Sequence, residues 1–310
     1  MWELRGVPAL AARWKADVVV GLSGVALPGV KVPQVVFAAN PRPIVAVPFR
    51  ERDHWLKHPV QRLAYRASAR RAALTVFNSA HLRGLHARYV STAPSPSLVV
   101  PHGLSGTTFT AARGRPERSR LGIVAASVWS RYKGPETLVD AISLVRGRLG
   151  IPTTLTLVGP WQDRKHRSSI EGRVRSLSLG ESVEITGFVS RDRLHSEYAA
   201  ARLFVLPSHT ESFGLPALEA QAFGTPTVGS STTAMPEVCG AGGVYCEPGQ
   251  SEVLAQLIAQ VLDDQCLWER MSAEARANAR RHTWASAAAP LVDLLHQHAG
   301  ARRAPFTIAA

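Results

Sequence analysis

Two glutamates frame the stretch of this chain whose residue types are best suited to chemistry. Glu211 and Glu219 have seven residues between them, in the run ESFGLPALE, and Pro216 stands where a helix would begin. A helix N-terminus carries roughly half a positive charge and free N–H groups, so it attracts phosphate. Carboxylates beside it accept hydrogen bonds from sugar hydroxyls. The stretch therefore predicts a cradle for a sugar phosphate.

The helix of this stretch is predicted to be short, because Gly224 and Pro226 end it after about two turns. The first turn of a helix leaves its amides unpaired. We therefore expect the N–H groups of Leu215, Ala217 and Leu218 to point toward the space beside Glu211.

A lysine in an earlier segment supplies the cation that such a phosphate needs. Lys133 and Gly134 precede Pro135, which is expected to start another helix, and Arg131 lies two residues before the lysine. Cations at a helix N-terminus stabilise phosphate oxygens. The alternative is a pair of ordinary surface cations. The Lys-Gly-Pro order favours phosphate binding.

The sequence offers no metal site beside these residues. The nearest acidic pair, Glu51 and Asp53, lies in the other half of the chain, and Cys239, Cys246 and Cys266 lack the spacing of metal ligands. We therefore expect cations and helix amides to stabilise the bound phosphate, with no metal ion or other cofactor. The odd number of cysteines argues against a disulfide framework and favours a reducing, cytoplasmic location.

The run from Glu211 to Glu219, followed by Gly224-Thr-Pro-Thr-Val and Pro236-Glu237, resembles the signature of the retaining glycosyltransferases of family 4, the glycosyl transferases group 1. The resemblance covers about residues 120 to 290 and is thin before them. It implies the GT-B fold, in which two Rossmann-like α/β domains face a cleft. It also implies a retaining reaction, in which the acceptor hydroxyl attacks from the face that the diphosphate leaves.

The resemblance assigns roles to individual residues. Glu211 is expected to bind hydroxyls of the donor sugar, Glu219 the ribose, and Lys133 the diphosphate. The family carries a second cation where this chain has Val128, and Arg131 is the nearest substitute. The predicted catalytic residues are thus Glu211, Lys133 and Arg131, and the predicted substrate-binding residues are Glu219, Ser212, Phe213, Gly214, Leu215, Gly187, Phe188 and Asn40.

Three of the positions that the resemblance singles out have alternatives or depart from the family. Gly187 and Phe188 resemble the family's contact with the nucleoside base, although Phe188 is equally compatible with a core position. Asn40 stands where family members often carry a histidine; it can hydrogen-bond a substrate but cannot exchange a proton near neutral pH. His102, in a Pro-His-Gly turn, is either a catalytic contributor or structural.

The alternation of apolar and helical segments predicts parallel α/β sheets in two domains. We expect a first domain over 1–112, a linker over 113–120 at the end of the Arg-, Thr- and Gly-rich stretch 106–120, a second domain over 121–285, and a crossover helix with a tail over 286–310. By the resemblance, the first domain is expected to lack roughly its first quarter, which in the family holds a strand and a glycine-rich loop.

The basic charge is confined to the first part of the chain. Residues 1–120 hold 18 Lys or Arg and 5 Asp or Glu, a net charge of +13 that equals that of the whole chain. Such an excess indicates an acidic partner, either nucleic acid or an anionic membrane surface. Nucleic acid is not expected, because the basic segments lack interleaved aromatic residues and recognised nucleic-acid motifs.

A helix predicted between Trp55 and Ala73 carries Arg62, Arg66 and Arg70 on one face. A basic amphipathic helix of this kind can lie on anionic lipid. The alternative is an ordinary solvated helix face.

The resemblance implies a transferase that moves a hexose from a nucleoside diphosphate sugar to a polysaccharide, lipopolysaccharide or lipid-linked acceptor. The apolar stretch Val18–Val30 is interrupted by glycines and a proline, so it predicts neither a membrane span nor a signal peptide. We expect a cytoplasmic protein, or one that is peripheral on the inner face of the membrane. The alternative function is a non-catalytic remnant that binds a sugar nucleotide or a partner protein.

Overall fold

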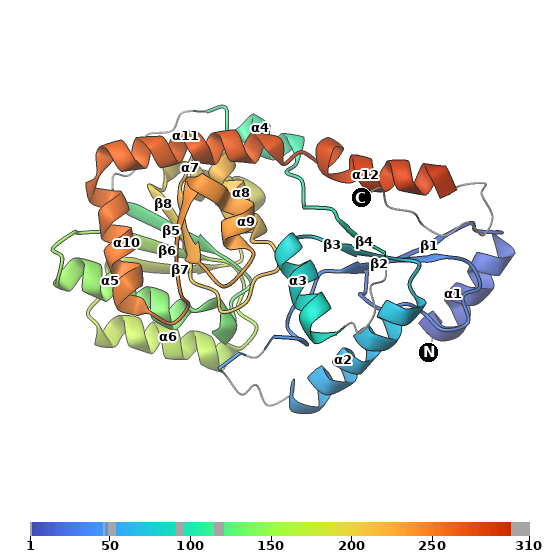
Figure 1. Ribbon diagram of the computed structural model, residues 1–310. Coiled ribbons are helices and arrows are strands. Elements are labelled where there is room, and N and C mark those ends of the chain that lie inside the picture. Colours follow the sequence, from blue (N-terminus) through green and yellow to red (C-terminus); the bar gives the residue numbers. More distant parts are fainter. Residues whose placement is uncertain (1, 46, 49–53, 91–95, 115–120, 299–310) are drawn as a thin grey trace. The chain divides into compact units, whose positions relative to one another are not determined.

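The structure of the chain, a computed structural model, describes residues 2–45, 47–48, 54–90, 96–114 and 121–298 (Figure 1). Residues 115–120 of the expected linker and the acidic pair Glu51 and Asp53 lie outside this part. The chain divides into two compact units, of which the first comprises Met1–Gly103 with Trp284–Ala310, and the second comprises Leu104–Thr283. The chain therefore leaves the first unit after Gly103 and returns to it at Trp284.

A short helix lies at the start of the Arg-, Thr- and Gly-rich stretch 106–120. Residues Gly106–Ala111 form α4, and the hydroxyl of Ser105 caps this helix by accepting a hydrogen bond from the amide of Thr108. The sequence analysis did not predict this helix, which ends just before the expected linker 113–120.

The first unit contains a parallel sheet, as expected. In the described residues its strand order is β1 (Val19–Gly21), β2 (Gln34–Ala38), β3 (Leu74–Phe77) and β4 (Ser97–Val99). Its helices are α1 (Trp2–Arg13), α2 (His54–Arg71), α3 (Ala80–Tyr89) and α12 (Trp284–His298). Leu291 and Leu294 of α12 pack on Val35 and Leu74 of the sheet. A separate cluster joins α2 and α3 to the sheet, so helices cover both faces (Figure 1).

The second unit is built on a six-stranded parallel sheet. Its order in the described residues is β10 (Gly243–Cys246), β9 (Thr227–Ser230), β8 (Leu203–Leu206), β5 (Gly122–Ala126), β6 (Thr154–Val158) and β7 (Val183–Gly187). The helices α5 (Pro135–Gly147), α6 (Arg164–Ser176) and α10 (Ser251–Asp263) pack together, as do α7 (Arg191–Ala200), α8 (Leu215–Ala222) and α11 (Gln265–Arg281), with α9 (Met235–Cys239) beside α8. These two groups of helices lie on opposite faces of the sheet, whose central strands are buried on both sides.

The order of this sheet reverses between β5 and β8. The strands β5, β6 and β7 run toward one edge, whereas β8, β9 and β10 run toward the other. At such a switch point the loops after the two central strands leave a crevice at their carboxyl ends, and ligands of parallel α/β sheets bind there.

A glycine allows the loop after β5 to touch the segment after β8. Gly134 has φ +70°, a left-handed conformation, and a Cβ atom at this position would lie 2.5 Å from the carbonyl oxygen of Pro207. Nearby, the amide of His209 donates to the carbonyl oxygen of Tyr132 at 2.7 Å. The two loops are therefore held together through their main chains.

We expect Gly134→Ala to lower the free energy of unfolding by roughly 2–4 kcal/mol, because the left-handed conformation costs a residue with a Cβ about 1–2 kcal/mol and the clash adds more. Gly150→Ala is the matched control, since Gly150 has φ +67° but no atom within 4 Å of the added Cβ. Chemical denaturation of both variants measures the difference. An equal loss in the two variants would show that the contact with Pro207 plays no part.

Candidate functional site

The switch point of the second unit brings together the two charged residues that the sequence analysis assigned to one ligand. Lys133 follows β5 and Glu211 follows β8, and these strands pair directly through Val124 and Phe204. The ammonium Nζ of Lys133 donates to Oε2 of Glu211 at 2.5 Å, and the side chains are only 12% and 14% exposed. The sheet thus closes an ion pair between residues that lie 78 positions apart.

The helix N-terminus beside Glu211 has fewer free amides than expected. Gly214 has φ +90°, and a Cβ there would overlap the sulfur of Met235, so glycine is required before α8. The amides of Ala217 and Leu218 both donate to the carbonyl oxygen of Gly214, at 3.0 and 3.2 Å. The expectation that these two amides are free was therefore wrong, because the helix begins one residue early and its first carbonyl accepts both. The amide of Leu215 is the one of the three for which the described residues give no acceptor.

The turn between the two glutamates is anchored by its aromatic residue. The side chain of Phe213 is buried and packs edge-on against the ring of His282, with 6.1 Å between ring centroids. Ser212 is half-buried in the same turn. The buried side chain of Phe213 therefore holds the backbone of the turn in place. This is compatible with the prediction that Phe213 binds the substrate through its main-chain amide.

Arg131 has a different partner from Lys133. Its Nη1 atom lies 3.9 Å from Oε1 of Glu136, and the same oxygen lies 2.7 Å from Nε2 of the buried His166. Burial acts to raise the pKa of Glu136, but the hydrogen bond with His166 and the charge of Arg131 lower this pKa below its ordinary value. The structure thus places Arg131 in a pair with Glu136 and does not bring it to Glu211.

Two tryptophans support the loop that carries these cations. Trp129 is fully buried, donates its indole N–H to the carbonyl oxygen of Val158 at 2.9 Å and stacks on Trp161 at 5.6 Å between centroids. Trp161 in turn packs against His166. The sequence analysis did not identify this support, although two tryptophans that each follow a strand end were a usable signal.

Glu219 is the most buried of the predicted acidic residues, with 9% of its surface exposed. Tyr198 donates its hydroxyl to Oε2 at 3.3 Å, and Nη1 of Arg191 lies 3.6 Å from Oε1. Burial raises the pKa of Glu219, while Arg191 and Tyr198 oppose that rise. The sequence analysis missed both partners. A buried carboxylate requires such partners, but the sequence does not say which residues of α7 supply them.

The structure decides one alternative at the end of β7. Gly187 has φ +73°, and the side chain of Phe188 is 82% exposed. Phe188 is therefore not a core residue, and the interpretation as a core position was wrong.

Two further positions lie in the first unit. The exposed Asn40 accepts a hydrogen bond from the amide of Arg42 through Oδ1 at 3.0 Å. His102 has Nε2 3.4 Å from Nδ2 of Asn78, and its ring packs edge-on against Trp284 at 6.0 Å. Burial lowers the pKa of His102, so the ring is neutral near neutral pH. These contacts account for the histidine as a structural residue.

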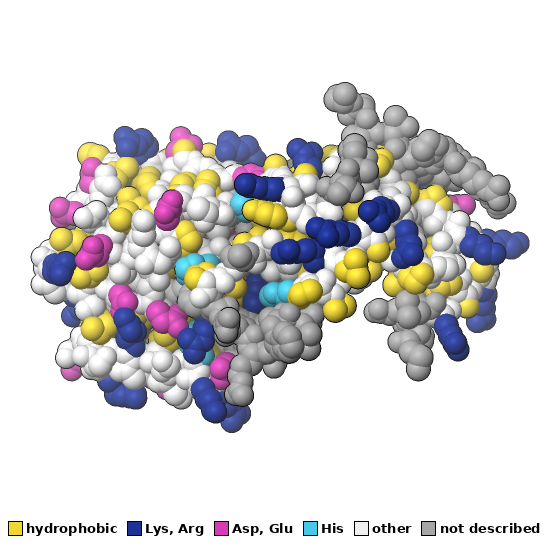
Figure 2. All heavy atoms as spheres, turned by 60° about the horizontal axis from the view of Figure 1, so that its bottom comes forward, with side chains coloured by type: hydrophobic (Ala, Val, Ile, Leu, Met, Phe, Trp, Pro, Cys, Tyr) yellow, Lys and Arg dark blue, Asp and Glu magenta, His cyan; other side chains and the backbone are white. Residues whose placement is uncertain are grey.

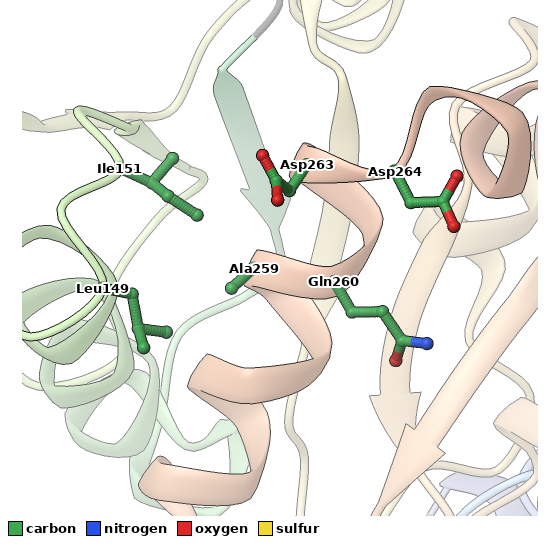
Figure 3. A pocket seen from close by; sticks show the side chains of 6 residues that line it. All are labelled: Leu149, Ile151, Ala259, Gln260, Asp263 and Asp264. Carbon is green, nitrogen blue, oxygen red and sulfur yellow. The ribbon is translucent and has the colours of Figure 1, made fainter.

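Other features of the described residues do not add to this site. Within residues 2–298, apart from the gaps given above, no group of three or more His, Cys, Asp or Glu side chains is placed to hold a metal ion. A pocket of about 380 Å³ lies between α10 and the segment after α5 (Figure 3). It is lined by Leu149, Ile151, Ala259, Gln260, Asp263 and Asp264. Ile151 precedes β6, so the pocket lies at the amino edge of the sheet, away from Lys133.

The chain matches known proteins over the unit that carries this site. A family model described as glycosyl transferases group 1 matches residues 112–281. A D-inositol 3-phosphate glycosyltransferase of Kineococcus radiotolerans is 32% identical over 227 residues, which cover 65% of this chain and 52% of that protein. The O-antigen chain mannosyltransferase B of Escherichia coli is 35% identical over 142 residues, covering 44% of this chain and 35% of that protein. The chain thus spans about half or less of the length of these relatives.

A comparison of structures extends the likeness to both units. The crystal structure of HepE from Anabaena in complex with UDP-glucose has a TM-score of 0.76 and 20% sequence identity, covering 95% of this chain and 82% of that one. The two parallel sheets and the arrangement of helices are those of the GT-B fold. Because the family model matches more than half of its residues, the chain belongs to the glycosyl transferases group 1 family.

Proposed function

We propose that the chain is a retaining glycosyltransferase of family 4 that moves a hexose from a nucleoside diphosphate sugar to a polysaccharide, lipopolysaccharide or lipid-linked acceptor, without a metal ion or other cofactor. The observation that carries the proposal is the contact between Lys133 and Glu211 at the switch point of the second sheet. Both residues lie in the segment matched by the family. HepE, whose fold this chain shares, is described in complex with UDP-glucose.

Each part of the donor has a chemical counterpart in the proposed site. Lys133 and the N-terminus of α8 present positive charge to the diphosphate. Glu211 accepts hydrogen bonds from the sugar hydroxyls, and Glu219 accepts them from the ribose. The exposed ring of Phe188 and the backbone of Gly187 face the base. Arg131 is a secondary cation, since Glu136 already holds it.

The proposed reaction exchanges one glycosidic oxygen for another on the same face of the sugar. The bond between the anomeric carbon and the diphosphate breaks, the acceptor hydroxyl forms the new bond from the side that the diphosphate leaves, and the hydroxyl proton passes to the departing diphosphate. Such a transition state needs positioning and stabilisation of the leaving charge more than a strong base. Lys133 and the amide of Leu215 at the N-terminus of α8 supply that stabilisation in this proposal.

The environment of Glu219 links its proposed role to stability. A carboxyl group whose pKa is raised in the folded protein contributes stability that is fully present below its unfolded pKa and is lost as the pH rises through the folded value. At neutral pH Glu219 therefore contributes less to stability than it does below its unfolded pKa. An ionised carboxylate is nevertheless the better acceptor for a ribose diol.

We further propose that the first unit lies on an anionic membrane surface through α2, at a cytoplasmic location. None of the helices in the described part of the chain has the length and apolar character that a bilayer span requires. A lipid-linked acceptor would nevertheless be met at a membrane surface. The support for this proposal is the composition of one helix face.

Arginines and aliphatic residues share the exposed face of α2. Arg66 and Arg70 are exposed there, and Val60 and Leu63 are 67% and 68% exposed. Arg62 lies at the edge of this face and donates to the carbonyl oxygen of Pro43. Neither α2 nor α3 contains an acidic residue. Figure 2, which turns the α2 side of Figure 1 toward the viewer, shows Lys and Arg side chains among hydrophobic ones. Exposed aliphatics beside cations are typical of helices that bind anionic lipid.

We expect Glu219→Gln to lower the affinity for a bound nucleoside diphosphate sugar by about tenfold, because a neutral amide accepts weaker hydrogen bonds than a carboxylate. The same variant should be more stable than the wild type at pH 7, and this gain should vanish below the ordinary pKa of 4.5. Calorimetric binding to UDP-, GDP- and ADP-sugars and denaturation at several pH values measure both effects.

Glu274→Gln is the matched control, since Glu274 is exposed on α11. It should change neither quantity. If the wild type binds no nucleoside diphosphate sugar of the panel, the proposed function is wrong. If it binds one and Glu219→Gln leaves the affinity unchanged, only the ribose assignment fails.

We expect the double variant Arg66→Gln/Arg70→Gln to bind vesicles with anionic lipid about 30-fold more weakly than the wild type, since each cation near such a surface contributes about 1 kcal/mol. Binding should also fall with added salt. Sedimentation with vesicles that contain phosphatidylglycerol measures the partition.

The matched control for lipid binding is Arg164→Gln/Lys165→Gln, which removes two exposed cations from α6 in the second unit. It should leave binding nearly unchanged. Equal binding to neutral and anionic vesicles would contradict the proposal, and so would stronger binding to duplex DNA than to the vesicles.

A further inference from the structure

The ion pair between Lys133 and Glu211 uses the same charges that the donor would use. Nζ of Lys133 lies 2.5 Å from Oε2 of Glu211, and also 5.2 Å from the ring centroid of Tyr132. Both charged side chains are largely shielded from water. The cation assigned to the diphosphate and the carboxylate assigned to the sugar are therefore paired with each other.

A diphosphate that approaches Lys133 must compete with this carboxylate. Both ligands of the ammonium are anionic, and they repel each other more strongly in a shielded site than in water. Among the described residues, the ion pair given for Glu211 is the one with Lys133. Loss of that partner leaves a poorly solvated carboxylate, which is unfavourable unless new hydrogen bonds replace the lysine.

We propose that Lys133 and Glu211 form an exchange pair, in which donor binding transfers Lys133 from Glu211 to the diphosphate and frees Glu211 to accept hydrogen bonds from the sugar. This inference rests on the proposed function. The carboxylate of Glu211 repels the diphosphate but accepts hydrogen bonds from the sugar. The pair therefore favours binding of the intact donor over binding of the nucleoside diphosphate product. Glu211 thereby promotes release of the product once the sugar has left.

The exchange has a signature that a purely structural role of Glu211 lacks. With the nucleoside diphosphate alone, the wild type loses the ion pair and gains no contact for Glu211. With the nucleoside diphosphate sugar, hydroxyls replace the lost partner. Removal of the carboxylate charge should therefore change the two affinities in opposite directions.

The experiment compares Glu211→Gln with the wild type by calorimetry. The probes are UDP, GDP and ADP and their hexose conjugates, used with the whole chain. We expect Glu211→Gln to bind the nucleoside diphosphate about tenfold more tightly and its sugar conjugate about tenfold more weakly. Glu247→Gln, which removes an exposed charge after β10 at the same edge of the sheet, should change both affinities less than about twofold.

A second background separates competition for Lys133 from any other effect of Glu211→Gln. In a Lys133→Met background, Glu211→Gln should no longer tighten binding of the nucleoside diphosphate, because the ammonium group for which the carboxylate and the diphosphate compete is absent. An unchanged or weaker affinity of Glu211→Gln for the nucleoside diphosphate, with the wild type binding it, overturns the exchange and leaves the proposed function standing. Failure of the wild type to bind any probe overturns both.

Discussion

The direct pairing of β5 with β8 is the constraint on which the proposed site depends. Because the two strands are parallel neighbours, the loops that follow them open at the same edge of the sheet. One loop ends in Lys133 before α5, and the other carries Glu211 before α8. Gly134 lets the two main chains touch, and Phe213 anchors the second loop in the core. With another order of strands, Lys133 and Glu211 would not lie at neighbouring strand ends.

The hydrophobic pattern alone made much of this unit predictable. The alternation of apolar and helical segments predicted parallel α/β sheets, and both units contain one in their described residues. Buried parallel strands are nearly all apolar and are bounded by glycine and proline, so their periodicity is easy to recognise. The short helix α4 was missed because its six residues carry no apolar period.

The partners of the charged side chains were much less predictable. The spacing of the signature indicated the glutamates, but the contacts of Glu219 with Tyr198 and Arg191 depend on how α7 packs against α8. Likewise, the contact of Glu136 with the buried His166 depends on how α6 packs against α5. Such contacts are tertiary, so the local sequence pattern does not predict them. Exposure is also tertiary, which is why Phe188 could be assigned to the surface only from the structure.

The central claim is that the crevice at β5 and β8 binds the diphosphate of a nucleotide sugar through Lys133. A crystal structure of the chain grown with a nucleoside diphosphate tests it most directly. The account predicts a phosphate oxygen about 2.8 Å from Nζ of Lys133, beside the N-terminus of α8. A diphosphate bound elsewhere on the second unit, with Lys133 still on Glu211, would contradict the account.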